Sequence, residues 1–134
     1  MCLNKLENFK VTQNYGWQVF KKKKDTGELY GYYFGYEPLP VGEWQKDKFR
    51  IRDRWIYTAE TNARYKKGFH IFLEWEDVKE WFPGPDGYCI KKVRFEKVVA
   101  QGLQDVGILG KQPQYARVVI CHKRFIEPDQ PKDI

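Results

Sequence analysis

Two segments near the carboxyl end of the chain decide the fold: Tyr88–Gly102, which reads YCIKKVRFEKVVAQG, and Tyr115–Ile126, which reads YARVVICHKRFI. In the first, apolar residues alternate with charged ones, and the Val98–Val99 pair indicates a bulge or a locally two-sided strand. In the second, the apolar run Val118–Ile120 has no polar face, which is typical of a central strand covered on both sides. The two segments therefore predict a pair of long strands, the second of which is central in its sheet.

Further strands are predicted upstream of this pair. Gly16–Lys22 and Leu29–Tyr36 are expected to form a hairpin, because Asp25–Glu28 between them carries the Asp and Gly that turns need. Gly68–Leu73 is a short apolar run and is predicted to be a buried strand. These segments add to the strand content but contain no recognisable repeat.

One helix is predicted at Glu74–Phe82, where apolar residues recur at helical spacing and acidic residues fill the first turn. The element order β-β-β-β-α-β-β predicts an α+β fold, in which one main helix packs on a curved, mainly antiparallel sheet of about five to six strands. Residues 1–126 are expected to form a single domain, and residues 127–134 a carboxyl-terminal tail.

Composition limits the class of protein. The chain has 134 residues, of which 42% are hydrophobic and 17% aromatic, with a formal net charge of +6 and a pI near 9.2. Such a chain is long and apolar enough to fold, and its positive charge favours anionic partners. Its three cysteines are too few and too irregular for a disulfide framework. The sparse, odd number of cysteines predicts a reducing, cytoplasmic location. No membrane insertion is expected, because the chain contains no long apolar run.

A row of arginines is the first candidate for binding. Strict alternation over Phe49–Tyr57 predicts a half-buried strand with Arg50, Arg52 and Arg54 on one face and mainly aromatic residues on the other. Guanidinium groups bind phosphate or carboxylate with two parallel hydrogen bonds. The alternative is a solvated face whose arginine stems cover apolar surface. The polar stretch that follows, Thr58–Lys67, is predicted to be a loop.

Three other residues complete the candidate site for an anionic ligand. Lys92 belongs to the basic strand near the carboxyl end, and Tyr33 offers a ring on which a base can stack. His70 has two roles open to it: binding a phosphate or acting as a general base, or the structural role of a partly buried histidine. No catalytic residue, metal site or cofactor is predicted, because no recognised catalytic, phosphate-binding or zinc-binding motif is present.

Several short segments resemble one group of proteins. The Met1–Cys2 start, the Gly42-Glu43-Trp44 segment and the Gly68-Phe69-His70 segment before an acidic helix resemble small uncharacterised accessory proteins encoded by tailed bacteriophages. The resemblance implies that the chain is made in the cytoplasm of an infected bacterium. It also implies a protein that binds and blocks a host component, such as part of a defence system.

These observations predict a non-enzymatic phage accessory protein that sequesters or blocks an anionic host target. The expected target is a nucleotide-type ligand or an acidic protein surface. Two alternatives stay open: nucleic-acid binding by the basic strand face, and a small enzyme centred on His70 or a cysteine. Assembly into a homo-oligomer through exposed aromatic surface is a further possibility.

Overall fold

The computed structural model describes residues 3–31, 37–46, 55–81, 87–107, 112 and 114–128, without the side chains of 80 and 81. Within these ranges the elements are β1 (Lys5–Leu6), β2 (Tyr15–Lys22), β3 (Leu29–Gly31), β4 (Trp44–Lys46), β5 (Trp55–Tyr57), β6 (Arg64–Lys66), β7 (Phe69–Phe72), α2 (Trp75–Trp81), β8 (Tyr88–Asp105) and β9 (Tyr115–Ile126). Over the part of the chain that is described, no helix has the length and apolar character needed to cross a bilayer.

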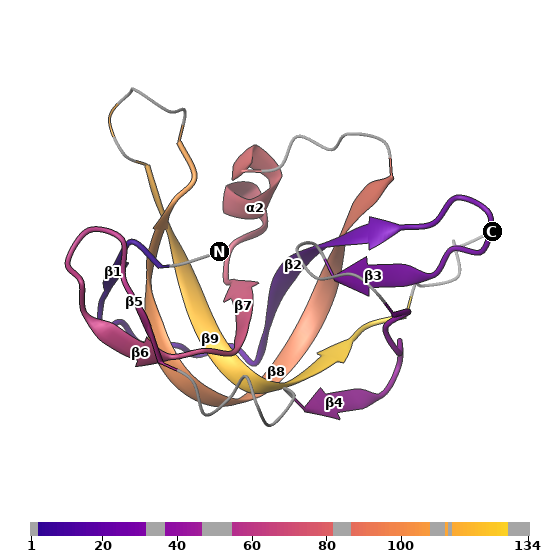
Figure 1. Cartoon of the computed structure of the whole chain (residues 1–134), viewed down its shortest axis with the longest axis horizontal. Helices are drawn as coiled ribbons and strands as arrows, with labels where there is room; N and C mark the ends of the chain where they lie inside the picture. The colour runs from indigo at the N-terminus through magenta and orange to yellow at the C-terminus, as the bar shows by residue number, and fades with distance from the viewer. Residues whose placement is uncertain are drawn as a thin grey trace.

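The strands form one large sheet and one small one, and every pairing between described strands is antiparallel. The large sheet has seven strands in the order β1-β8-β2-β7-β9-β4, with β3 paired to β2 and an additional pairing of β8 with β9. The pairings β2–β8, β8–β9, β9–β7 and β7–β2 therefore close a ring of four strands. Figure 1 shows the two longest strands, β8 and β9, curving beneath β7 and α2.

Two hydrophobic clusters hold the fold together, one on each face of the ring strands. Neighbouring residues divide between them: Val19 and Phe72 belong to one cluster, and Phe20 and Ile71 to the other. The first cluster also takes up Val78 of α2 and extends to the small β5–β6 sheet. Strands that are buried on both faces read as continuous apolar runs, and this accounts for the Val118–Ile120 pattern.

The ring closes where β2 meets β7, and this contact depends on a glycine. The register pairs Trp17 with Phe72. A Cβ atom on the adjacent Gly16 would lie 2.3 Å from the backbone oxygen of Phe72 and 2.5 Å from Cγ2 of Ile71. Because heavy atoms cannot approach so closely, any larger residue at this position would push β2 and β7 apart.

The predicted α+β class is wrong, because the described fold is mainly β. The helix α2 has only seven residues and lies over the curved sheet without forming a separate layer (Figure 1). The predicted sheet of five to six strands is also wrong, since the large sheet has seven strands and the small one two. The strands that the sequence did not predict, β1, β4 and β6, have only two or three residues each. Such lengths are too short to show a periodicity.

Several individual elements agree with their predictions. The strand at Tyr115–Ile126 has the predicted bounds, and β2, β7, β8 and α2 differ from theirs only at the ends. The bulge in β8 is confirmed by a register shift between Val98 and Ala100, next to Lys97 at a φ of 57°. The predicted loop at 58–67 is wrong in its last part, because Arg64–Lys66 forms β6 and pairs with β5.

Candidate functional site

Most of the arginine-centred site lies outside the described residues. This applies to Arg50, Arg52, Arg54 and Tyr33. One related expectation is open to comparison at Trp55 and Tyr57, which the alternation placed on the buried face of the strand. Both side chains are exposed, at 47% and 54%, and it is Ile56 between them that packs on the hydrophobic cluster. The burial implied for this end of the strand is therefore wrong.

His70 lies in the middle of β7, half-buried, with its ring edge-on to that of Tyr65 at 6.5 Å between centroids. Its Nδ1 atom is fully enclosed and has no hydrogen-bond partner among the described residues. Burial lowers the pKa of His70 from 6.5 to about 3, since desolvation disfavours the charged imidazolium. The ring is therefore neutral at physiological pH and supplies no positive charge to an anion.

The two described cysteines considered for catalysis, Cys89 and Cys121, lie at the second hydrophobic cluster. Cys121 is fully buried in the second hydrophobic cluster, and Cys89 packs against the same cluster. His122 points to the other face of β9, where its Nε2 lies 2.9 Å from the backbone oxygen of Lys67. Among the described residues, no group of three or more His, Cys, Asp or Glu side chains is arranged to hold a metal ion.

Lys92 belongs to a surface that crosses four adjacent strands. The sheet register aligns Tyr15 of β2 with Arg94 of β8, Arg94 with Phe125 of β9, and Phe125 with Trp44 of β4. Aligned residues share one face of a sheet, as do residues two positions apart on a strand. These alignments define what we name the aromatic–cation row: Tyr15, Lys92, Arg94, Phe125, Lys123 and Trp44.

Rings and cations contact one another along the whole row. The Lys92 ammonium lies 4.4 Å from the centre of the Tyr15 ring, the Arg94 guanidinium 4.9 Å from Phe125, and the Lys123 ammonium 5.2 Å from Trp44. Trp44 and Phe125 also contact each other directly, with 5.5 Å between centroids. These distances are within the range of cation–π attraction, which orders the long basic side chains over the rings.

The row remains open to solvent even though two of its cations are ion-paired. Arg94 pairs with Glu127, and Lys123 lies 3.4 Å from Glu96. The Arg94 side chain is 49% exposed, and Trp44 is 38% exposed. One partner of each pair is about half exposed, Arg94 at 49% and Glu96 at 51%, and the other is less so, Glu127 at 18% and Lys123 at 26%. Ion pairs that are open to solvent contribute about 0–1 kcal/mol. An incoming phosphate can therefore replace the carboxylates at small cost.

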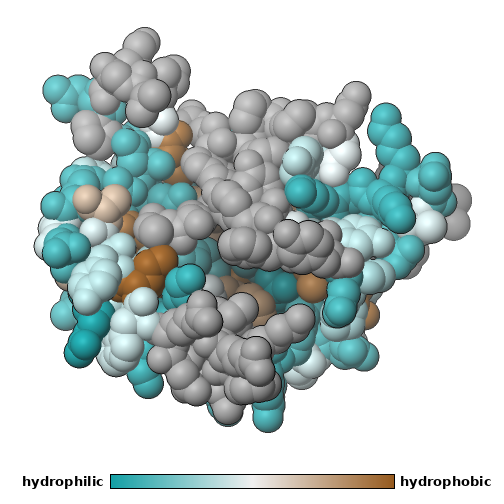
Figure 2. Space-filling model, in the orientation of Figure 1, coloured by the Kyte–Doolittle hydropathy of each residue, from teal (hydrophilic) through white to brown (hydrophobic). Residues whose placement is uncertain are grey.

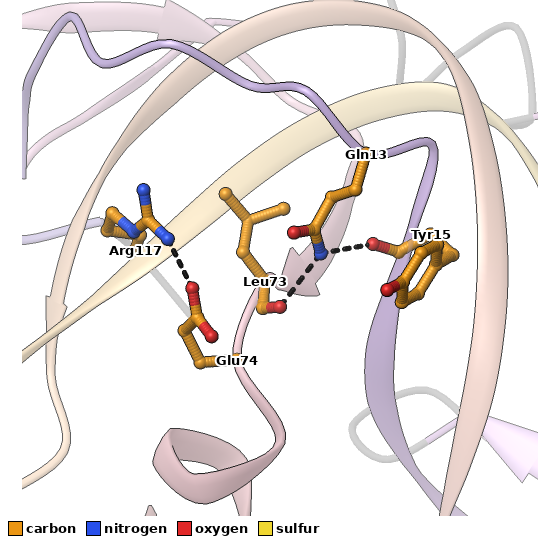
Figure 3. Close-up of polar contacts among 5 residues, drawn as sticks. All are labelled: Gln13, Tyr15, Leu73, Glu74 and Arg117. Carbon is orange, nitrogen blue, oxygen red and sulfur yellow. Dashed lines mark hydrogen bonds and ion pairs between the residues drawn. The ribbon is translucent and has the colours of Figure 1, made fainter.

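The first strand of the row is fixed by hydrogen bonds at its start. The Gln13 side-chain amide donates to the backbone oxygens of Tyr15 and Leu73, at 2.7 and 2.8 Å. This amide links the beginning of β2 to the end of β7, as Figure 3 shows. Next to it, Arg117 of β9 pairs with Glu74 just before α2. These contacts hold Tyr15 at a defined position beside β8.

A buried arginine supports the row from the opposite face of β9. Arg124 is only 6% exposed, and its guanidinium lies 3.9 Å from the centre of the Phe69 ring. It donates to the side-chain oxygens of Gln18 on β2, at 2.9 Å, and of Gln45 on β4, at 3.1 and 3.2 Å. Arg124 therefore connects three of the four strands on which the row is built.

The sequence predicted Lys92 but not the residues around it. Tyr15, Trp44 and Phe125 come from three separate segments, and only the pairing of non-consecutive strands aligns them. A weak signal is present in the sequence, because a basic and an aromatic residue stand two positions apart at Lys123 and Phe125. The surface itself becomes visible only with the strand order.

Comparison of the chain with protein-family models, with curated proteins and with solved structures gives no match.

Proposed function

We propose that this protein binds single-stranded nucleic acid on the aromatic–cation row. The observation that carries the proposal is the register, which aligns Tyr15, Arg94, Phe125 and Trp44 across four neighbouring strands. Rings and cations are the two components of a single-strand binding surface, because bases stack on the rings and phosphates pair with the cations. In the row the cations lie over the rings, so an incoming base takes the place of a cation on the ring while the cation turns to the phosphate. Known sheet surfaces with exposed rings stack two or three bases in this way.

The geometry favours an unpaired strand over a duplex. In a duplex the faces of the bases are already stacked, and recognition then requires an element that enters a groove. The row is instead an exposed surface about three strand spacings wide, or about 14 Å. The net charge of +6 adds a general attraction for polyanions.

The sequestration of a nucleotide-type ligand or the blocking of an acidic protein surface is the competing proposal. Nucleic-acid binding and the competing proposal use the same cations. An acidic protein surface differs in what it offers the rings, because it supplies no bases to stack on Trp44 or Phe125. The phage context stays a prediction about where the protein is made, and the binding proposal does not depend on it.

Fluorescence anisotropy with a labelled oligothymidine of about 12 nucleotides tests the proposal. We expect the affinity to fall with salt, and the slope to decrease by about 0.7 in Lys92→Ala, since one phosphate contact is lost. Trp44→Ala should weaken binding about tenfold through the loss of one stacked base. Trp44→Phe, which keeps a ring, should retain most of the affinity.

Lys24→Ala is the matched charge control, because Lys24 is exposed in the β2–β3 turn and lies outside the row. It removes the same charge as Lys92→Ala and should leave the affinity within about twofold of the wild type. Equal losses in Lys24→Ala and Lys92→Ala would mean that net charge alone attracts the strand, and the row would then have no specific role. Tighter binding of AMP than of the oligonucleotide would favour the nucleotide proposal.

A further inference from the structure

A second exposed surface combines aromatic and basic residues, on the small β5–β6 hairpin. Its register pairs Trp55 with Lys66 and Tyr57 with Arg64, so all four side chains lie on one face. The opposite face carries Ile56 and buried Tyr65, which pack on the first hydrophobic cluster. The hairpin face is the outer one, defined by Trp55, Tyr57, Arg64 and Lys66.

The hairpin is held rigidly although each of its strands has three residues. Leu3 donates its backbone N–H to the Tyr65 hydroxyl at 2.9 Å, in a buried hydrogen bond. In the turn, the Thr58 hydroxyl accepts from the backbone N–H of Ala63 at 2.9 Å. Two backbone N–H groups of the turn also donate to the amino-terminal segment: Ala59 to the Leu3 oxygen and Glu60 to the Asn4 oxygen, each at 2.9 Å. A surface fixed in this way loses little entropy when it binds.

The cations of the hairpin face are available to a ligand. The Arg64 guanidinium lies 4.3 Å from the centre of the Trp55 ring, and the Lys66 ammonium 5.7 Å from it. Over the residues that the structure describes, neither cation is within ion-pairing distance of a carboxylate. Figure 2 shows residues of intermediate hydropathy among strongly hydrophilic ones at the left of the view, where Figure 1 places β5 and β6.

We infer that the hairpin face is a second contact site for single-stranded nucleic acid. This inference rests on the proposed function of the aromatic–cation row, and it adds that one protein molecule holds a strand at two places. Positive charge excludes a basic partner, and the two exposed rings with two cations, which meet no carboxylate among the described residues, fit bases joined by phosphates. Figure 1 places the hairpin at the left and β4 at the lower right, so the two surfaces lie on different sides of the molecule.

Two separate sites predict a dependence on strand length. A strand of about six nucleotides should occupy one site at a time, and two such strands should bind per protein at saturation. A strand long enough to reach both sites should bind one protein with a much lower Kd, because the second contact becomes intramolecular. An oligothymidine series from about 6 to about 30 nucleotides covers both cases.

The experiment compares Arg64→Ala/Lys66→Ala with Lys23→Ala/Lys24→Ala, which removes the same charge from the β2–β3 turn. In native mass spectrometry, the wild type should take up two short strands and the hairpin variant one. For the long strand, the hairpin variant should lose about tenfold or more in affinity, and the turn variant about twofold or less. Circular dichroism checks that each variant is folded.

The outcomes separate the two proposals. If the hairpin variant binds like the wild type while Lys92→Ala and Trp44→Ala lose affinity, the second site is absent and the proposed function of the row stands. If the hairpin variant loses binding and the row variants do not, the strand binds only at the hairpin and the row proposal fails. If the turn variant loses as much as the hairpin variant, the inference is overturned, since charge alone then explains the loss.

Discussion

The aromatic–cation row and the hairpin face present the same chemistry on two different supports. The row spans four strands of the large sheet, and two of its cations are ion-paired with Glu96 and Glu127. The hairpin face stands on two three-residue strands, and its cations contact the Trp55 ring, with no carboxylate of the described residues within ion-pairing distance. Both surfaces therefore place rings beside cations, but they differ in how deeply they are anchored and in how much of their charge is compensated.

This difference indicates that the position of each surface in the sheet determines how it is anchored and how much of its positive charge is compensated. The row lies over the closed ring of strands, where Arg124 connects its supports through Gln18 and Gln45. The hairpin is attached through Tyr65 and through hydrogen bonds to the amino-terminal segment. Perturbing one support at a time should therefore affect one surface more than the other.

The largest effect is expected from Arg124→Ala. This change removes the stack on Phe69, leaves the acceptor oxygens of Gln18 and Gln45 without their donor, and opens a cavity. We expect a loss of about 3 kcal/mol in the free energy of unfolding, measured by urea denaturation. Arg124→Lys keeps the charge but not the planar fork, so it should recover only part of the loss. Unchanged stability in both variants would mean that Arg124 does not support the row.

A smaller effect, of about 2 kcal/mol, is expected from mild acid between about pH 7 and pH 5, acting on the hairpin side of the core. His70 has a pKa of about 3 in the folded protein and 6.5 when unfolded. The unfolded chain therefore binds more protons between these values, and stability is lost as the pH falls from 6.5 towards 3. The expected slope is about 1.4 kcal/mol per pH unit. Because the ring of His70 faces that of Tyr65, the hairpin should loosen first.

His70→Phe provides the comparison for the acid experiment. The variant keeps an aromatic ring in contact with Tyr65 and has no group that must be kept neutral. Urea denaturation at about pH 7 and pH 5 should show a smaller loss of stability on acidification in the variant than in the wild type. Hydrogen exchange of the β5–β6 amides reports whether the hairpin opens before the rest. Equal acid sensitivity of the two proteins would refute the assignment to His70.

The smallest effect is expected from releasing a cation of the row. Glu127→Gln removes the carboxylate that pairs with Arg94 and raises the net charge by one. We expect oligonucleotide affinity to increase about threefold and stability to change by less than about 1 kcal/mol. Glu28→Gln makes the same charge change at a half-buried position between β2 and β3. A gain of the same size in Glu28→Gln would assign the effect to net charge.

The sequence was sufficient for the long strands and insufficient for their arrangement. The run at Val118–Ile120 and the alternation in β8 are strong local signals, because burial on two faces or one face leaves a direct trace in the pattern. The short strand β4 leaves no such trace, since its three residues are ordered by pairing with β9 and by the hydrogen bond that Gln45 accepts from Arg124. The predicted α+β class was wrong because the one helix has only seven residues and does not form a layer of its own.

The candidate site shows the same limit. Lys92 could be predicted from the basic composition of its strand. His70 could be singled out from its place beside an acidic helix, but it does not belong to the row. The alignment of Tyr15, Phe125 and Trp44 depends on pairings between segments that are far apart in the chain. The exposure of Trp55 could not be predicted from the sequence either, because Ile56, and not the larger ring, is directed to the core.

The closed ring of strands has a consequence for solubility. Open sheet edges pair readily with other chains, and an edge rich in aromatic residues is a particular aggregation hazard. Closure gives β2, β7, β8 and β9 neighbours on both sides, and the edges that the described sheet leaves are the two- and three-residue strands β1, β3 and β4. Edges this short, two of them carrying a lysine, are poor templates for intermolecular sheets. The protein can therefore display many aromatic rings to solvent and still resist self-association through its backbone.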